Sequence, residues 1–252
     1  MGLTSALLLG PSVAGAVAAQ PGAFAAKPGA HAANQGAPSA GPHAPVGGSP
    51  RIIDGSMATV NPGAVSLSNR PGVHNCTASL IAPNWVLTAK HCATAKEKPE
   101  VRVGATAWAK GELMVVDRTV MAPNADLALM HLTADVTTAT PVKLADANPP
   151  VGSIVTMWGW GLTSPSATMT SPDLKFAQGK IATYTDADAY GGKAVSINGV
   201  DGTVWQGDSG GPAFTADGIQ FGVASTAQYW NKQNTYVQVA TYRGWIKDVA
   251  GV

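Results

Sequence analysis

The residues with the clearest potential for chemistry lie in a glycine-rich segment near the end of the chain, Gly-Asp-Ser-Gly-Gly-Pro at residues 207–212. Ser209 stands between small residues, which leave its hydroxyl open to a substrate. The glycines around it allow backbone N–H groups to turn toward one point, where they can bind the negative oxygen of a tetrahedral intermediate. A serine alone in such a segment would be read as a polar turn, so the chemistry depends on finding a base and an acid for it.

The position of the histidine decides which kind of serine site this is. The pattern Gly-x-Ser-x-Gly at residues 207–211 also fits the nucleophile elbow of α/β-hydrolases, which need an acid and then a histidine after the serine. No histidine follows Ser209, so that arrangement is excluded. His91 directly follows an apolar stretch, and Asp126 opens another, where burial beside an imidazole is expected. The order His91, Asp126, Ser209 is the order of a chymotrypsin-type triad.

The elements that must position these residues are predicted to be short strands. Of 252 residues, 45% are hydrophobic and 12% charged, and the 29 glycines and 18 prolines favour many turns over long helices. Strand-like runs separated by turn residues occur at 79–81, 85–88, 101–103, 113–116, 154–157, 221–224 and 236–239. Only residues 240–249 look helical. This rhythm predicts an all-β sandwich or barrel.

The first 51 residues have a different composition. Residues 1–25 are predicted to be a signal peptide, because their apolar centre is followed by Ala-Phe-Ala at 23–25, although no Lys or Arg opens the segment. Residues 26–51 form a Pro/Gly/Ala tract that cannot bury enough apolar surface to fold, and they are predicted to be a disordered propeptide. Cys76 and Cys92 would pair in a secreted protein and remain thiols in a cytosolic one.

Charge limits the partners of the chain. The formal net charge is +1 without a basic cluster, so neither nucleic acid nor a membrane is an expected partner. Asp186 and Asp188 are interpreted as residues of a solvated loop rather than metal ligands. No cofactor and no metal are expected, and nothing in the sequence indicates an oligomer, so a monomer is expected.

Four motifs in order resemble the trypsin/chymotrypsin family of serine endopeptidases, in its bacterial secreted branch. They are Ile-Ile-Asp-Gly at 52–55, Thr-Ala-Lys-His-Cys at 88–92, Asp-Leu-Ala-Leu at 126–129 and the segment at 207–212. A fifth, Gly-Trp-Gly at 159–161, resembles the strand and turn before the family's specificity loops. The similarity covers residue 52 to about residue 249. It implies two antiparallel six-stranded β-barrels, at about 52–140 and 141–240, with a C-terminal helix at 241–249 and the active site in the cleft between the barrels.

The resemblance implies a role for each residue of the site. Ser209 would be the nucleophile, His91 would take its proton and pass it to the leaving amine, and Asp126 would hold the imidazole tautomer. The backbone N–H groups of Gly207 and Ser209 would form the oxyanion hole. Losing one such donor typically costs about 3–4 kcal/mol in the barrier.

The resemblance also implies that the chain is made as a zymogen and activated by cleavage after Arg51. The freed amine of Ile52 would pair with Asp208 and draw residues 207–209 into the oxyanion-binding shape. The alternative is that Arg51 only marks the end of a linker. His74 matches a family position that can hold the aspartate before activation, and a purely structural role is its alternative.

Cys76 and Cys92 match the family's disulfide beside the catalytic histidine, which contributes roughly 3 kcal/mol by the loop-entropy model. The family's other common disulfides are absent, and Trp205 stands where a cysteine would support the loop before Gly207. His131 has no catalytic context and is interpreted as a satisfied strand residue.

Thr203, six residues before the nucleophile, matches the base of the family's primary specificity pocket, where an aspartate would select Arg and Lys. The walls would be Val204, Ser225, Thr226, Ala227 and Asn234. Such a neutral pocket suits an uncharged side chain, apolar or aromatic. The alternative is that Asp201 reaches the base through a two-residue insertion, which would make the specificity trypsin-like. The neutral pocket is favoured, and both stay open here.

The resemblance thus implies a secreted, extracellular serine endopeptidase that hydrolyses peptide bonds through an acyl-enzyme intermediate. Its expected partners are protein or peptide substrates and an activating protease, and a protein inhibitor is a further candidate. Two alternatives remain: a catalytically inactive, protease-like binding protein that kept the fold, and an esterase with the same triad.

Overall fold

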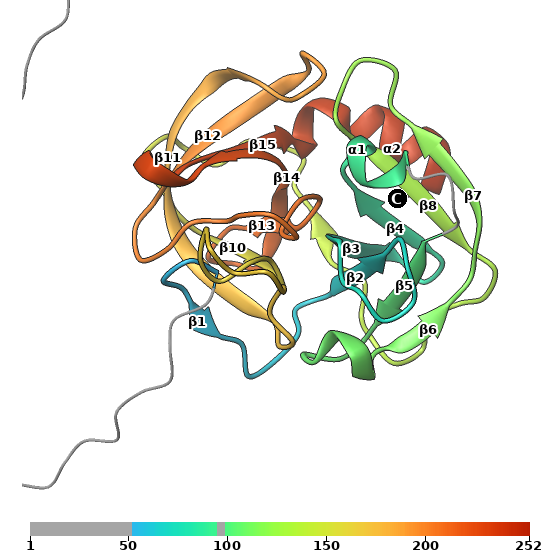
Figure 1. Cartoon of the computed structure of the whole chain (residues 1–252). Helices are drawn as coiled ribbons and strands as arrows, with labels where there is room; N and C mark the ends of the chain where they lie inside the picture. Colours follow the sequence, from blue (N-terminus) through green and yellow to red (C-terminus); the bar gives the residue numbers. More distant parts are fainter. Residues whose placement is uncertain (1–51, 95–98) are drawn as a thin grey trace, which may run out of the picture. The chain divides into compact units, whose positions relative to one another are not determined.

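The computed structural model describes residues 52–94 and 99–252. The predicted signal peptide and propeptide, together with Arg51, lie outside these residues. Within them fifteen of the twenty elements are β-strands, which form two sheets that lie side by side (Figure 1). All strand pairs are antiparallel except that of β9 with β14.

The first sheet contains seven strands in the order β6-β5-β2-β3-β4-β8-β7. They are β2 (Ala64–Ser68), β3 (Cys76–Ala82), β4 (Trp85–Thr88), β5 (Glu100–Val103), β6 (Glu112–Met114), β7 (Val116–Met121) and β8 (Ala128–Leu132). Only Val115 separates β6 from β7, so one bent stretch of chain pairs with β5 at one edge and with β8 at the other. The sheet is therefore a curled half-barrel.

The second sheet contains eight strands, and six of them close into a barrel. They are β1 (Ser56–Met57), β9 (Lys143–Leu144), β10 (Ile154–Gly159), β11 (Lys175–Ala187), β12 (Lys193–Gly199), β13 (Pro212–Phe214), β14 (Ile219–Gln228) and β15 (Gln233–Gln238). The order β11-β10-β13-β14-β15-β12 closes because β11 also pairs with β12. The short strand β1 joins this sheet by pairing with β11.

The helical elements are short. They are α1 (Lys90–Ala93), η1 (Trp108–Lys110), η2 (Tyr229–Asn231), η3 (Val239–Tyr242) and α2 (Arg243–Ala250). The helix α2 buries Ile246 and is followed by Gly251, whose positive φ suits the residue after a helix. No helix within the described part of the chain has the length and apolar character needed to cross a membrane.

The prediction of an all-β, chymotrypsin-like fold with a short C-terminal helix is confirmed. The second half is the closed six-stranded barrel that was expected. The first half differs from the six-stranded barrel that was expected. The chain bends at Val115, which divides one stretch into β6 and β7, and the sheet is a half-barrel of seven strands.

One apolar cluster joins the two sheets and so fixes the strands that carry the candidate site. It contains Leu87 and Leu129 from the first sheet, Phe214 and Val223 from the second, and Ile246 from α2. Each of these side chains is at most 3% exposed. Burial of an apolar side chain of this size is worth about 1.5–3 kcal/mol, so the cluster resists relative movement of the two sheets.

Candidate active site

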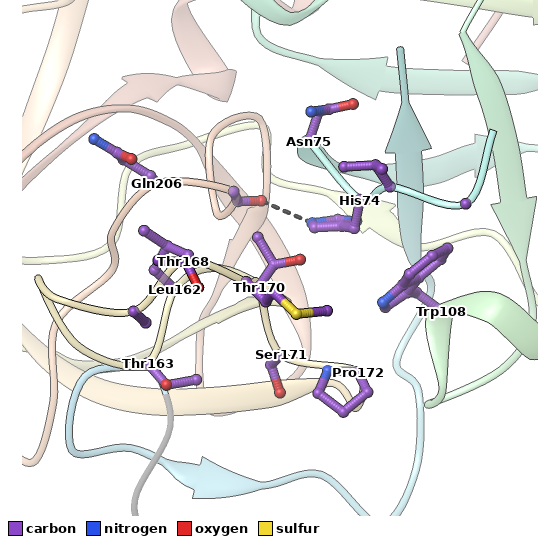
Figure 2. Close-up of a pocket in the computed structure, with 15 residues that line it drawn as sticks. His74, Asn75, Trp108, Leu162, Thr163, Thr168, Thr170, Ser171, Pro172 and Gln206 are labelled. Atoms are coloured by element: carbon purple, nitrogen blue, oxygen red, sulfur yellow. Dashed lines mark hydrogen bonds between the residues drawn. The ribbon is translucent and has the colours of Figure 1, made fainter. Parts of the chain in front are cut away.

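The turn that carries Ser209 is fastened to strand β3 of the other sheet. The backbone N–H of Thr77 donates to the carbonyl oxygen of Ser209 at 2.8 Å. The hydroxyl of Thr77 donates to the carbonyl oxygen of Gly207 at 2.9 Å. That carbonyl also accepts from Nε2 of His74 at 3.0 Å (Figure 2). The second-sheet turn is therefore held by residues of the first sheet.

This fastening leaves two N–H groups of the turn available. The N–H groups of Asp208, Gly210 and Gly211 donate to carbonyl oxygens of the surrounding chain. Those of Gly207 and Ser209 have no acceptor among residues 52–94 and 99–252. These are the two donors that the sequence predicted for an oxyanion hole, and available N–H groups at a nucleophile are what that function requires.

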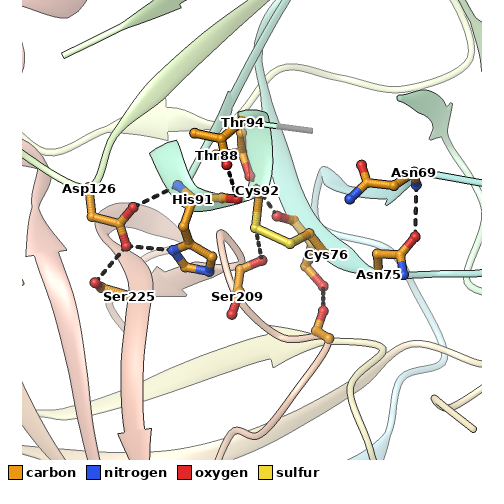
Figure 3. Close-up of a disulfide and its surroundings, with 12 residues drawn as sticks. Asn69, Asn75, Cys76, Thr88, His91, Cys92, Thr94, Asp126, Ser209 and Ser225 are labelled. Carbon is orange, nitrogen blue, oxygen red and sulfur yellow. Dashed lines mark hydrogen bonds and ion pairs between the residues drawn. A yellow bond between two sulfur atoms is a disulfide. The ribbon is translucent and has the colours of Figure 1, made fainter. Parts of the chain in front are cut away.

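His91 and Asp126 form the pair that the sequence predicted. Nδ1 of His91 lies 2.7 Å from Oδ2 of Asp126, and the backbone N–H of His91 donates to Oδ1 at 3.0 Å. Ser225 donates its hydroxyl to Oδ2 at 2.7 Å. Because an ionised carboxylate only accepts, Nδ1 carries the proton and Nε2 remains an acceptor. Figure 3 draws the imidazole between Asp126 and Ser209.

The position of Asp126 follows from local structure. It precedes β8 and is fully buried, whereas the side chain of His91, at the start of α1, is one-third exposed. Burial is the largest single influence on the Asp126 carboxyl and raises its pKa. The hydrogen bonds from His91 and Ser225 outweigh it, so the pKa is held below its usual value. Asp126 is thus an anion that can orient an imidazole.

Asp208 is fully buried beside the Gly-Trp-Gly segment. Its Oδ1 accepts from the N–H of Gly161 at 2.7 Å and its Oδ2 from the N–H of Trp205 at 2.8 Å. A Cβ at Gly159 or Gly161 would lie 2.3 Å from a carboxylate oxygen of Asp208, so glycine is required at both positions. Burial raises the pKa of Asp208 to about 7, although these N–H groups and the charge of Lys175 act in the opposite direction.

His74 contacts Gly207 rather than the carboxylate of Asp208. Its Nε2 faces a carbonyl, which only accepts, so Nε2 carries the proton and Nδ1 accepts from the hydroxyl of Ser66 at 2.7 Å. Burial lowers its pKa to about 4, with the bond to Gly207 acting the other way. His74 is therefore neutral at physiological pH.

The segment that follows the predicted cleavage site is already seated in the second barrel. Ile52 is fully buried in the same apolar cluster as Val155, Ile197 and Phe221. Its φ is +46°, which is a strained conformation for a β-branched residue. Ile53 forms a bridge with Thr203. Arg51 lies outside the described residues.

The predicted disulfide is present. Cys76 at the start of β3 is bonded to Cys92 in α1, with their Cα atoms 6.1 Å apart (Figure 3). The bond anchors the short helix of His91 to the strand that also holds the Ser209 turn.

A cavity of about 200 Å³ opens beside Ser209. It is lined by Val204, Trp205, Gln206, Ser209, Ala224, Ser225, Thr226 and Ala227. No charged side chain belongs to this lining. Four of the predicted pocket residues, Val204, Ser225, Thr226 and Ala227, thus surround one cavity.

The three remaining predicted pocket residues lie elsewhere. Thr203 and Asn234 are fully buried outside the lining, where the hydroxyl of Thr203 donates to Oδ1 of Asn234 at 2.8 Å. Asp201 lies on an exposed turn, and its carboxylate accepts from the N–H of Gln178 at 2.6 Å. In this structure the aspartate is a surface turn residue.

A second, larger cavity of about 1080 Å³ adjoins the other side of the site. Figure 2 shows His74 and Trp108 on one side of it, and Leu162, Thr168 and Gln206 on the other. Gln206 borders both cavities. The two cavities therefore share one wall residue close to Ser209.

One acidic residue differs from its interpretation in the sequence, and another was not considered there. Asp188 was interpreted as a solvated loop residue, but it is buried and its Oδ2 accepts from the backbone N–H of Asp126 at 3.0 Å. Asp117, which was not singled out, lies 2.7 Å from Nδ1 of the strand residue His131. The Gly-Gly pair at 191–192 indicates a tight turn after Asp188, but it does not indicate that the fold buries the carboxylate.

A sequence model of one protein family, described as trypsin, matches residues 52–246. Among curated relatives, trypsin delta of Drosophila erecta is 27% identical over 227 residues, covering 78% of this chain and 87% of the relative. Trypsin 5G1 of Aedes aegypti is 31% identical over 231 residues, covering 80% of this chain and 86% of the relative. These relatives are insect trypsins and do not support the bacterial branch that was expected from the motifs.

Solved structures share the fold. Neuropsin, a serine protease expressed in the limbic system of mouse brain, superposes with a TM-score of 0.65 at 26% identity, covering 75% of this chain and 94% of that chain. Human heparin binding protein gives a TM-score of 0.69 at 22% identity, covering 79% and 96%, and at that identity the likeness shows the fold alone.

Proposed function

The chain belongs to the trypsin family of serine proteases, and from that premise we propose that it is a secreted endopeptidase that hydrolyses peptide bonds through an acyl-enzyme intermediate. The observation that carries the proposal is the pair of His91 and Asp126 at 2.7 Å, whose imidazole lies between Asp126 and Ser209 (Figure 3). A base that is oriented by a buried anion is the arrangement that activates a serine hydroxyl.

In the proposed reaction, Oγ of Ser209 attacks the carbonyl carbon of the scissile bond while Nε2 of His91 takes the hydroxyl proton. The resulting oxyanion accepts from the N–H groups of Gly207 and Ser209. His91 then gives its proton to the leaving amine and the C–N bond breaks, which leaves an acyl group on Ser209. A water molecule, deprotonated by His91, attacks the carbonyl carbon of this ester. His91 then gives that proton to Oγ of Ser209 as the ester C–O bond breaks and the acid is released.

The two adjoining cavities favour an endopeptidase. An extended peptide that crosses Ser209 has residues on both sides of the scissile bond. The cavity of about 200 Å³ and the cavity of about 1080 Å³ share Gln206 in their linings, so we assign one part of the peptide chain to each. An esterase that acts on small acyl groups would not need the second cavity.

The smaller cavity supports a preference for uncharged side chains before the scissile bond. Its lining contains no carboxylate. The residue at the predicted base, Thr203, is neutral and is bonded to Asn234. The alternative, a specificity for Arg and Lys, requires Asp201 in the pocket. Asp201 is instead exposed and accepts a hydrogen bond from the backbone N–H of Gln178.

Activation by cleavage after Arg51 is part of the proposal. The φ of Ile52 is the torsion angle about its N–Cα bond. It exists only while the nitrogen of Ile52 is joined to the carbonyl carbon of residue 51. Cutting that bond removes the constraint behind the strained value of +46°. The new amine would be a cation close to the core in which Ile52 is buried, and Asp208, fully buried with a pKa raised to about 7, is the carboxylate that gains most from such a partner.

Secretion is supported by two observations. The segment 1–25 has the composition of a signal peptide. The bond between Cys76 and Cys92 forms and persists in oxidising compartments.

A cleavage profile tests the proposed function. The chain is cut at Arg51 with an added protease that is then removed, and the product is exposed to a mixed peptide library that is read by mass spectrometry. Cleavage after uncharged residues, absent in Ser209→Ala, is the expected result. Cleavage after Arg and Lys would instead support Asp201 in the pocket. No cleavage beyond the Ser209→Ala control would contradict the enzyme and favour a protease-like binding protein.

A further inference from the structure

The turn between β11 and β12 carries a buried carboxylate that the proposed reaction does not use. Asp188 is 7% exposed, although it lies at the tip of a hairpin. Its Oδ1 accepts from the N–H groups of Tyr190 and Gly192 at 2.8 and 2.9 Å. These two bonds fold the turn around the carboxylate.

The second oxygen of the same carboxylate leaves the turn and reaches the other sheet. Oδ2 of Asp188 accepts from the backbone N–H of Asp126 at 3.0 Å. The next residue, Ala189, donates its N–H to the hydroxyl of Ser225 at 3.1 Å, and that hydroxyl donates to Oδ2 of Asp126 at 2.7 Å. The turn therefore contacts both the backbone and, through Ser225, the carboxylate of Asp126.

The chemistry of this position calls for aspartate. Three N–H donors converge on two oxygens, and only a carboxylate offers acceptors on both of its ends. An asparagine that keeps its oxygen toward Tyr190 and Gly192 must present its NH₂ group to the N–H of Asp126, which is a contact between two donors. The substitution Asp188→Asn therefore preserves the turn and removes the link to Asp126.

The close packing of the turn agrees with this link. A Cβ at Gly192 would lie 2.4 Å from Oδ2 of Asp188, 2.7 Å from the hydroxyl of Tyr242 and 2.8 Å from the carbonyl oxygen of Asn124. Asn124 is two residues before Asp126, so the turn is pressed against the segment that leads into the site. The absence of a side chain at residue 192 is what allows this approach.

We propose that Asp188 is a positioning residue for the triad: it holds Asp126, and through Asp126 the imidazole of His91, in register with Ser209 on the other sheet. The inference rests on the proposed function. Ser209 and Asp188 both belong to the second sheet's connections, whereas Asp126 and His91 belong to those of the first. A hydrogen bond across this boundary sets the distance between base and nucleophile, and small displacements of a base are costly to the chemical step.

The test compares Asp188→Asn with Asp186→Asn in the chain cut at Arg51. Asp186 lies in the same hairpin and carries the same charge, but its Oδ2 accepts from the hydroxyls of Ser196 and Thr235 and not from the site. Active sites are counted by titration with a phosphonate that reacts with the serine. We expect kcat per titrated site to fall about tenfold in Asp188→Asn with KM changed less than twofold, and both to stay within twofold in Asp186→Asn.

A spectroscopic readout separates positioning from general stability. The Nδ1 proton of His91, bonded to Asp126, is followed by proton NMR in uncut chains that also carry Ser209→Ala. We expect its resonance to move upfield in Asp188→Asn and to stay in place in Asp186→Asn. If Asp188→Asn does not fold, Asp188→Glu takes its place, because it keeps both acceptor oxygens but moves them by one methylene group.

Unchanged kcat per site together with an unmoved Nδ1 proton would overturn the inference, even if Asp188→Asn melted at a lower temperature. The two hypotheses fail differently. A wild-type chain that cleaves no peptide contradicts the proposed function, while the NMR comparison still decides whether Asp188 holds Asp126.

Discussion

Nε2 of His74 lies 3.0 Å from the carbonyl oxygen of Gly207, which turns that carbonyl toward the first sheet. The hydroxyl of Thr77 shares the same acceptor. With its carbonyl held in this direction, Gly207 has an N–H without an acceptor among the described residues, next to the equally available N–H of Ser209. A first-sheet histidine thus orients the turn of the second sheet that we propose as the oxyanion hole.

Replacing Asp126 by asparagine is expected to lower kcat about 10⁴-fold, because the amide no longer selects the His91 tautomer whose Nε2 is an acceptor. The measurement is steady-state hydrolysis of the best peptide from the library, with the active sites counted. Asp117→Asn is the matched control, since Asp117 makes an equally short contact of 2.7 Å with His131 on the surface. Loss of activity in Asp117→Asn, or little loss in Asp126→Asn, would contradict the assigned triad.

The stability of the uncut chain is expected to fall with rising pH because of Asp208. Its pKa in the folded chain is about 7 and its usual value is 3.8, so the folded state binds the proton more tightly than the unfolded state does. The stabilisation from the protonated form is complete below pH 3.8 and is lost as pH rises to about 7, by about 4 kcal/mol. Asp208→Asn removes this dependence. Thermal unfolding of both chains from pH 4 to pH 8 measures the difference.

The same scan in the cut chain tests the ion pair. A positive Ile52 amine stabilises the ionised carboxylate, so the loss of stability between pH 4 and 7 should disappear after cleavage at Arg51. An unaltered loss in the cut chain would mean that the amine does not reach Asp208.

His74 gives a pH dependence of opposite sign. Its folded pKa is about 4 and its usual value is 6.5, so the unfolded chain takes up a proton that the folded chain excludes. Stability is therefore lost as pH falls from 6.5 to 4, by about 3 kcal/mol. His74→Phe should abolish this loss and destabilise the chain at pH 7 by about 1–3 kcal/mol, because Ser66 and Gly207 lose a buried partner. Denaturant unfolding of both chains at pH 4.5 and pH 7 measures both effects.

The sequence predicted the parts of the site that are encoded locally. His91, Asp126 and Ser209, the proposed triad, each stand in a short motif whose residue types suit the proposed chemistry. Asp188 could not be found in this way, because its burial depends on Asn124 and Tyr242, which come from distant segments. An isolated aspartate before a glycine pair looks the same whether the fold covers it or leaves it in solvent.

The pocket illustrates the same limit at a finer scale. Counting residues back from Ser209 led to Thr203 as the base, and the neighbouring wall residues do line a cavity. Counting alone could not decide whether Asp201 shares that cavity, because this depends on how the turn after β12 folds. The bridge between Ile53 and Thr203 and the bond from Gln178 to Asp201 fix that turn.

Asp201→Asn is expected to leave the cleavage profile unchanged. The carboxylate lies on an exposed turn and accepts from the N–H of Gln178, which the amide oxygen can also do. The library experiment is repeated with the variant, and the ratio of cleavage after charged and uncharged residues is compared with that of the wild type. A tenfold or greater loss of cleavage after Arg and Lys would show that Asp201 reaches the substrate and that the neutral pocket is not the one used.

Arg51→Gln, which an arginine-directed protease cannot cut, is expected to remain inactive after a treatment that activates the wild type. Without the cut, Ile52 keeps its strained φ of +46° and has no amine to offer Asp208. Hydrolysis per titrated site measures activation, and mass spectrometry verifies that residue 51 is still joined to residue 52. Full activity in the uncut variant would contradict the activation model. In the cut wild type, activity should also decline as pH rises above the pKa of the Ile52 amine, which starts from about 8 and is raised by pairing.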